Sequence, residues 1–239
     1  MPSVAVVSRG PAHGATPVAV DADLTRFDII AVDADRLSAV IRRVVREGLS
    51  AAILPLTGDP KQDARLIKKP PTPASSATLV VCDSGLAERQ YGFSLGLGAF
   101  FHAADHSRAG GLRALRGAVA PVAATVVVDG HVIAEELTLA GASVSQRFPM
   151  KMKAPAPPGP GEFCFLWNNL DAGRLLSHAF ALVRGKQMPS HRVGVSRRLT
   201  FDLAGTGYSL DGALHTAEVA RVVSVTRGPD VRVCGAGTR

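Results

Sequence analysis

Aromatic residues and cysteine are both scarce in this chain of 239 residues. Phe, Trp and Tyr make up 5% of it, which disfavours a protein that stacks nucleic-acid bases on aromatic side chains. Its three cysteines, Cys82, Cys164 and Cys234, lie far apart and form no CxxC pair. The sequence therefore predicts neither a disulfide framework nor a structural zinc site, and it fits a reducing compartment.

Long apolar runs are also missing. The longest near-apolar run, residues 118–128, contains Pro121 and spans 11 residues, whereas a membrane helix needs about 20. Residues 1–14 lack the continuous apolar core of a signal peptide. We therefore expect a cytoplasmic protein that is at most peripheral at a membrane.

The charges that are present are mainly basic. Lys and Arg number 27 against 20 Asp and Glu, a net charge of +7. A positive field of this size suits phosphate-bearing partners, such as nucleotides or an anionic lipid surface. The alternative is a basic protein with no such partner, simply rich in arginine. The scarcity of aromatic residues argues against nucleic acid as the partner.

The N-terminal part has the pattern of an α/β unit. Short apolar runs at residues 4–8, 28–33 and 51–56 predict buried strands. Between the last two, residues 36–47 carry apolar side chains at helical spacing, and Gly48 follows as a stop signal. Strand, helix and strand in this order predict parallel pairing. Residues 68–76, with three prolines, then read as a linker or domain boundary.

The rest of the chain has mainly strand patterns. The expected strands are residues 78–82, 125–128, 136–139, 162–167, 198–203, 219–225 and 231–233, and two helical stretches interrupt them at 99–119 and 169–183. Many short strands with turn signals between them favour a β-sandwich or a strongly bent sheet. The glycine-rich residues 92–98 read as a structural turn that borders a pocket.

Three stretches resemble the diacylglycerol kinase, sphingosine kinase and NAD kinase superfamily. Residues 31–35 (AVDAD) stand where the family has GGDGT, and residues 54–65 (LPLTGDPKQDAR) stand where it has LPLGTGNDFAR. Residues 210–213 (LDGA) stand where the family has LDGE, and residues 184–186, followed by 192–202, resemble the stretch before it in bacterial lipid kinases. The resemblance covers nearly the whole chain, although no motif is intact.

The resemblance implies a fold of two domains. We expect α/β plus all-β architecture: a shortened Rossmann-like nucleotide-binding domain at 1–73, then a β-sandwich domain at 74–225. Residues 226–239 would form a terminal strand that returns to the first domain. A first domain of about 70 residues is marginally stable alone. It would lean on the second domain or on another copy of the chain, so a homodimer is reasonable.

The resemblance also implies the site residues. Asp33 and Asp211 would be the catalytic acids of an active enzyme, although a one-residue shift of the alignment puts Ala34 in place of Asp33. Nucleotide contacts would come from Asp35, Thr57, Gly58 and Arg65, and a lipid pocket would be lined by Phe93, Phe100, Phe101 and Trp167. ATP and Mg²⁺ would be the cofactors of an active enzyme.

The departures from the family motifs argue against ordinary phosphoryl transfer. Family glycines that let the backbone approach phosphate are replaced by Ala31, Val32 and Ala34, so side chains would project where phosphate oxygens sit. Pro60 removes an N–H donor from the second loop. Ala213 replaces a glutamate that the family uses in phosphoryl transfer, and a methyl group can take no proton.

Three functions follow as hypotheses. The first is a lipid-kinase-like protein that is impaired in phosphoryl transfer and binds a lipid or similar amphipathic ligand. The second is an active ATP- and Mg²⁺-dependent lipid kinase, and the third is a regulatory or scaffold subunit. The basic residues 147–153 and 184–198 are candidate contacts for anionic headgroups, or else solvated strand edges. His102 and His106 share a helical face, but no third metal ligand is evident.

Overall fold

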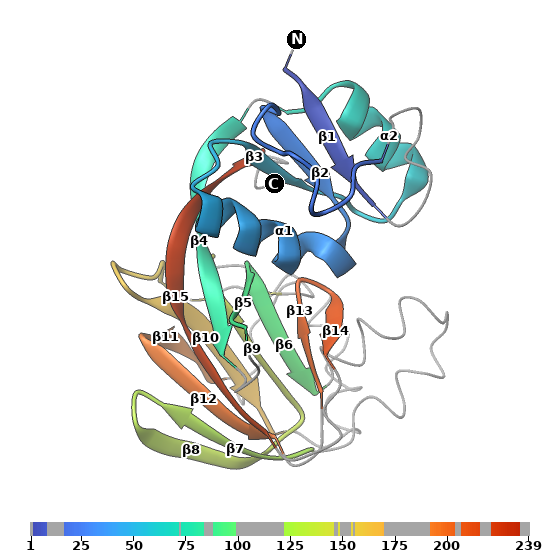
Figure 1. Cartoon of the computed structure of the whole chain (residues 1–239). Helices are drawn as coiled ribbons and strands as arrows, with labels where there is room; N and C mark the ends of the chain where they lie inside the picture. The colour runs from blue at the N-terminus through green and yellow to red at the C-terminus, as the bar shows by residue number, and fades with distance from the viewer. Residues whose placement is uncertain are drawn as a thin grey trace. The chain divides into compact units, whose positions relative to one another are not determined.

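The chain is organised in two compact units, Met1–Leu79 with Pro229–Arg239, and Val80–Gly228 (Figure 1). The computed structural model describes residues 2–8, 17–71, 73–83, 88–98, 122–145, 148, 154, 156–169, 192–203, 207–215 and 221–234. The predicted domain boundaries after residues 73 and 225 stay a prediction. The predicted helices at 99–119 and, beyond Asn169, at 169–183 lie outside the described residues.

Parallel strands form the centre of the first unit. β1 (Val4–Val7) pairs with β2 (Ile29–Val32), and β2 pairs with β3 (Ala52–Pro55), all in parallel. α1 (Ala34–Glu47) connects β2 to β3, which confirms the predicted βαβ pattern. The last strand of the chain, β15 (Arg221–Cys234), adds a parallel neighbour to β3 through the pair Val233–Ile53.

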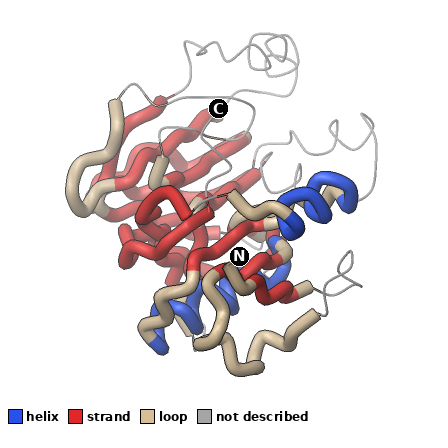
Figure 2. Tube along the Cα trace, turned by 90° about the horizontal axis from the view of Figure 1, so that it is seen from above, coloured by secondary structure: helices blue, strands red, loops and turns tan. Residues whose placement is uncertain are grey.

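A helix covers each side of these strands, as Figures 1 and 2 show. Every residue of β2 is buried, as expected for a parallel strand covered on both faces. α1 packs on β2 and β3 with an apolar stripe of Leu37, Val40, Ile41 and Val44. The second helix, α2 (Pro60–Lys68), packs Leu66 and Ile67 on the core cluster of Val6, Ile29, Ala31, Ala52, Leu54 and Cys234.

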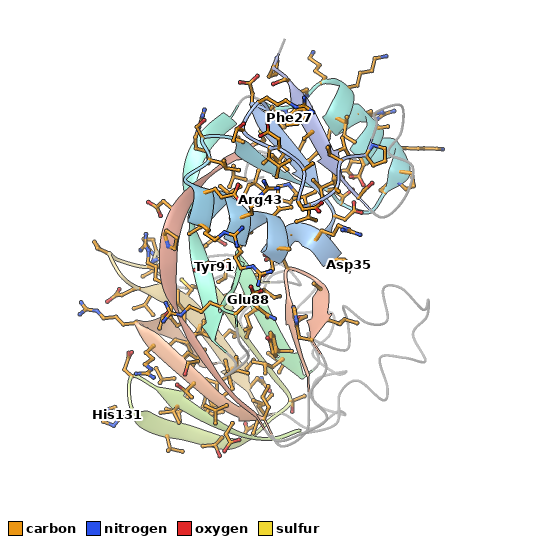
Figure 3. All side chains as sticks on the ribbon, viewed as in Figure 1. Phe27, Asp35, Arg43, Glu88, Tyr91 and His131 are labelled. Atoms are coloured by element: carbon orange, nitrogen blue, oxygen red, sulfur yellow. The ribbon has the colours of Figure 1, made fainter. Side chains whose placement is uncertain are left out.

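Arg43 fastens the β1–β2 connection to α1 (Figure 3). Its guanidinium Nη1 donates to the carbonyl oxygens of Val20 and Ala22. Its Nε donates to the Glu47 carboxylate at 2.9 Å, one helical turn further on. One side chain therefore satisfies two loop carbonyls and also joins an ion pair along the helix.

The second unit is built from antiparallel strands in two sheets. Its strands are β4 (Pro73–Asp83), which begins in the first unit, β5 (Gln90–Gly92), β6 (Ser94–Gly98), β7 (Val122–Val128), β8 (His131–Leu137), β9 (Leu139–Ser143), β10 (Phe163–Asn168), β11 (Arg192–Ser196), β12 (Arg198–Leu203), β13 (Tyr208–Leu210) and β14 (Ala213–His215). One sheet has the order β11-β10-β9-β6-β13-β14. In the other, β12 lies between β15 and β7, and β7 pairs with β8.

One hydrophobic core joins the two sheets of this unit. The six-stranded sheet contributes Leu95, Leu97, Phe163, Trp167 and Tyr208, among others, and the other sheet contributes Val126, Leu199, Phe201 and Val223. Inward side chains alternate with outward ones in β12, where Leu199, Phe201 and Leu203 are buried. The strand has the same bounds, 198–203, as the strand that the sequence predicted.

The structure corrects four predicted segments. The proline-rich linker is partly strand, since β4 begins at Pro73, and proline is tolerated at the first position of a strand. Residues 92–98 contain β5 and β6 rather than a turn alone, and residues 136–139 belong to two strands, β8 and β9. The two strands predicted at 219–225 and 231–233 are the single strand β15. Pro229 lies between the β15 residues that pair with β12, which end at Thr226, and Val233, which pairs with β3.

Candidate functional site

The carboxyl ends of β1, β2 and β3 define the candidate nucleotide edge of the first unit. Parallel strands end at the same sheet edge, and α/β proteins bind ligands there. Asp33 follows β2 as the residue before α1, and its N–H donates to the Val7 carbonyl at 3.3 Å. Leu56 follows β3 and donates to the Val32 carbonyl at 2.9 Å. The structure thus brings the predicted Asp33 and Thr57 segments to one edge.

Two of the replaced glycine positions have side chains that are buried in the core and not open at this edge. Ala31 and Val32 lie inside β2 and are fully buried, and Ala31 belongs to the core under α2. Their side chains therefore fill the core, and the expectation that they project toward phosphate oxygens is wrong for these two. Ala34, the first residue of α1, is partly buried beside Asp33.

The loop after β3 donates hydrogen bonds to a carboxylate of the same segment, that of Asp63. Asp63, on the inner face of α2, is 6% exposed. Its Oδ1 accepts from the N–H and the hydroxyl of Thr57, both at 2.8 Å, and its Oδ2 accepts from the N–H of Gly58 at 3.0 Å. A carboxylate that accepts several N–H and O–H bonds is held firmly in place. The amides that the resemblance assigned to phosphate therefore already bind an anion.

The remaining amides of this loop are used as well. The N–H of Asp59 donates to the Thr57 hydroxyl at 3.2 Å. The N–H groups of Lys61 and Gln62 donate to the Asp59 carboxylate at 2.9 and 3.3 Å, which makes Asp59 the N-cap of α2. Pro60 has no N–H to offer. Each backbone donor from Thr57 to Gln62 thus has an acceptor inside the same segment.

The other predicted nucleotide residues do not join this loop. Asp35, which is labelled in Figure 3, lies in the first turn of α1. Arg65 is exposed on α2, where the helical phase puts it on the side away from the buried Asp63. Within the described ranges, no group of three His, Cys, Asp or Glu side chains can hold a metal ion. Two nearby carboxylates, those of Asp59 and Asp63, already accept the loop amides, so a Mg²⁺ site does not fit this part of the edge.

Asp211 occupies a hairpin turn in the second unit. It has φ +51 and Gly212 has φ +84, the pattern of a two-residue Asp-Gly turn between β13 and β14. Its carboxylate accepts from the N–H of Phe93 and the N–H of Ser94, both at 2.8 Å, and from the Ser94 hydroxyl at 3.0 Å. Burial raises the pKa of this carboxyl group to about 6, although the three hydrogen bonds act in the opposite direction.

A second turn in the same unit uses the same device. Asp129 and Gly130 have φ +48 and φ +90 between β7 and β8. The Asp129 carboxylate accepts from the Ser196 hydroxyl at 3.0 Å and from the N–H groups of Arg197 and Arg198 at 3.1 and 2.9 Å. Since both Asp-Gly turns tie a hairpin to a neighbouring strand, the Asp-Gly pair in residues 210–213 has a structural reason independent of catalysis.

The structure describes two of the four predicted lipid-binding residues. Trp167 is 7% exposed and belongs to the hydrophobic core between the sheets. Phe93 is partly buried and precedes β6, beside Asp211. Phe100 and Phe101 lie outside the described residues. The lipid pocket therefore stays a prediction, with Trp167 already used in core packing.

Comparisons with known proteins identify the fold. No protein-family model and no curated protein matches the chain. Two solved structures of provisionally named diacylglycerol kinases from Bacillus anthracis str. Sterne share its architecture. Each match covers 84% of this chain and 75% of the other, with 10% identity and a TM-score of 0.53 in one case, and 11% and 0.51 in the other. The chain has a diacylglycerol kinase-like fold.

This diacylglycerol kinase-like fold confirms the resemblance drawn from three degenerate motifs. It is a mixed, sheet-rich α/β fold, as predicted in its coarse form. Among the described helices, none is long and apolar enough to cross a membrane.

The sequence reasoning missed a groove along α2 whose lining is mainly apolar. An open cavity of about 540 Å³ is lined by Gln62, Arg65, Leu66, Lys68 and Lys69. A helix at residues 60–68 was not predicted, because residues 54–65 were interpreted only through the family motif. Two local signals could have found it: an Asp at the N-cap and a Pro at the first helical position.

Proposed function

We propose that this chain is a lipid-kinase-like protein impaired in phosphoryl transfer from ATP, which acts by binding a lipid or a similar amphipathic ligand. The observation that carries the proposal is the Asp63 carboxylate bound to the amides of Thr57 and Gly58. A triphosphate at that place would have to displace a buried carboxylate, and it would meet like charge until it did.

The chemistry of proton transfer supports the same proposal. An Asp that removes a proton from a substrate hydroxyl must have a free oxygen within hydrogen-bond reach of it. Asp211 uses Oδ1 for two bonds and Oδ2 for one, all to the segment that opens β6. Ala213, the first residue of β14, offers a buried methyl group in place of the family's acid. We infer that Asp211 is a positioning residue for the 93–94 segment.

Support for an amphipathic ligand comes from the fold. The structures with which the chain shares its fold are named diacylglycerol kinases, and diacylglycerol is a lipid with a small polar head. We infer further that the second unit is a β-sandwich that follows a Rossmann-like first unit. The core shared by its two sheets supports that arrangement.

The nucleotide test is a thermal shift with ATP and Mg²⁺. We expect no change in Tm at millimolar ATP, because the loop amides already bind Asp63. A ligand present at 100 times its Kd stabilises by about 2.7 kcal/mol, which would raise the Tm by roughly 5–10 °C for a chain of this size. Such a rise, together with transfer of radiolabelled phosphate to diacylglycerol vesicles, would establish the active lipid kinase instead.

The ligand test is mass spectrometry of the purified, non-denatured chain. We expect a lipid-sized mass to accompany the protein and to be removed by organic extraction. A chain that carries no lipid, gains none from mixed micelles and elutes in a large heteromeric complex would contradict the binding function and favour a scaffold subunit. This outcome leaves the nucleotide result unaffected, so the two parts of the proposal can fail separately.

A further inference from the structure

The outward face of α2 consists of basic side chains. At about 100° per residue, Lys61, Arg65 and Lys68 lie within roughly 60° of one another around the helix axis, and all three are exposed. The buried Asp63 lies on the opposite side of the helix, and the partly buried Leu66 and Ile67 lie on the flanks, where they pack on the core. Lys69, the C-cap residue, extends the exposed basic row by one more cation. We call Lys61, Arg65, Lys68 and Lys69 the α2 basic face.

The carboxylates of the same segment do not neutralise this face. Asp59 accepts the amides of Lys61 and Gln62, and Asp63 accepts those of Thr57 and Gly58. Within the described part of the chain, none of the four cations of the α2 basic face forms an ion pair. Their charge is therefore directed at solvent, where an anionic surface can meet it.

The groove beside these cations has an aliphatic component. Leu66 lines the cavity together with Gln62, Arg65, Lys68 and Lys69. Because the lining is mainly apolar, the aliphatic parts of these side chains face the groove, which fits the glycerol and acyl part of a phospholipid, while lysine and arginine keep their charged ends in water. The five lining residues include no aromatic side chain on which a nucleic-acid base could stack.

We propose that the α2 basic face docks the first unit on a membrane surface rich in anionic phospholipid. Phosphate headgroups would bind Arg65, Lys68 and Lys69 at the groove, and Lys61 would contact the neighbouring headgroups. The interaction needs neither ATP nor a lipid bound in the second unit. It therefore holds or fails independently of the function proposed above.

The test is co-sedimentation of the full-length chain with lipid vesicles, without nucleotide. The probe is phosphatidylcholine vesicles that contain roughly a third phosphatidylglycerol, compared with pure phosphatidylcholine. We expect binding to the anionic vesicles alone, weakened by added salt. Each cation near such a surface contributes about 1 kcal/mol, or about fivefold in partitioning. The double variant Arg65→Gln, Lys68→Gln should thus bind about 25-fold more weakly.

A matched control removes the same charge elsewhere. Arg46 and Arg197 have side chains that are 69% and 77% exposed, and each pairs with one glutamate at the surface. The double variant Arg46→Gln, Arg197→Gln should retain wild-type binding within about threefold, because exposed charges act only over about a Debye length. Equal loss in both double variants would reduce the effect to net charge and overturn the proposal. So would duplex RNA binding that depends on Arg65 and Lys68 without any vesicle binding.

Discussion

Replacing Asp63 with alanine is expected to lower the free energy of unfolding by about 2–5 kcal/mol. The substitution leaves the N–H groups of Thr57 and Gly58 without their acceptor, and each unsatisfied, partly buried donor costs about 1–3 kcal/mol. It also removes the acceptor of the Thr57 hydroxyl. Thermal unfolding should show a Tm lower by roughly 5–15 °C, in the transition that reports on the first unit.

Two further variants should lose less stability than Asp63→Ala. Asp63→Asn keeps one oxygen for Thr57 but turns an amide NH₂ toward the N–H of Gly58, so its loss should be intermediate. Asp59→Ala removes only an exposed N-cap and should cost about 1 kcal/mol. If Asp63→Ala unfolds no more easily than Asp59→Ala, the three hydrogen bonds do not hold the loop closed.

Added inorganic phosphate tests whether the amides of Thr57 and Gly58 form an anion site that Asp63 occupies. In Asp63→Ala the two amides are free to bind another anion, so phosphate should restore part of the lost stability. A matched control is Ile41→Ala, which shortens a fully buried side chain of α1. The cavity destabilises the first unit without removing the acceptor of any amide, so phosphate should not restore its stability. Equal rescue of both variants would reduce the effect to a general salt effect.

Asp211 is expected to make the protein less stable as the pH rises from about 4 to 7. The pKa of its carboxyl group is about 6 in the folded chain and 3.8 in its ordinary state. Between these values the folded state binds more protons than the unfolded state, so the free energy of unfolding falls with rising pH. The difference between the two pKa values corresponds to a destabilisation of about 3 kcal/mol. This destabilisation is complete above about pH 7 and absent below about pH 3.

The matched control for this prediction is Asp211→Asn. Asp23, Asp28 and Glu47 have lowered pKa values, mainly through hydrogen bonds with Thr25, Ser3 and Arg43 respectively. These groups lose stabilisation as the pH falls, but they are present in both proteins and cancel in the comparison. Denaturant titrations of both chains at pH 4 and pH 7 should differ by about 3 kcal/mol in their pH dependence. Parallel pH dependences would mean that the Asp211 carboxyl group is not held in a desolvated place.

Asp211 also shows why its catalytic role needs more than a loss-of-activity variant. In Asp211→Asn, one oxygen that accepts from Phe93 or Ser94 becomes an NH₂ group. The hairpin and the start of β6 would then lose their connection, whatever the substrate does. If Asp211→Asn lowers both the activity and the Tm, Asp211 is a positioning residue. If it lowers the activity at an unchanged Tm, Asp211 is a catalytic residue.

Local patterns predicted the elements whose determinants lie within a few residues. The helical spacing of Leu37, Val40, Ile41 and Val44, followed by Gly48, gave α1 to within two residues of its start. β12 agreed in both bounds because its inward and outward residues alternate. β15 was predicted as two strands, at 219–225 and 231–233, because nothing local shows that one strand passes from pairing with β12 to pairing with β3.

The candidate site depended on longer-range information. The motif comparison identified Thr57 and Gly58 but could not show that Asp63 returns to their amides from the next helix. The partners of Asp211 are 117 and 118 residues away in the chain, so no spacing rule connects them. On one face of β2, Ala31 belongs to the core cluster on which Leu66 and Ile67 of α2 pack, and the sequence reasoning had not included that helix.

The late position of β15 bears on how the protein is made. Val233 and Cys234 complete the sheet and core of the first unit, which otherwise uses residues from the beginning of the chain. During synthesis, the N-terminal strands must wait for the ribosome to release this segment before their last neighbour arrives. Until residues 221–234 have been synthesised, the nascent chain exposes the β3 edge, where a chaperone that shields apolar strand edges would bind.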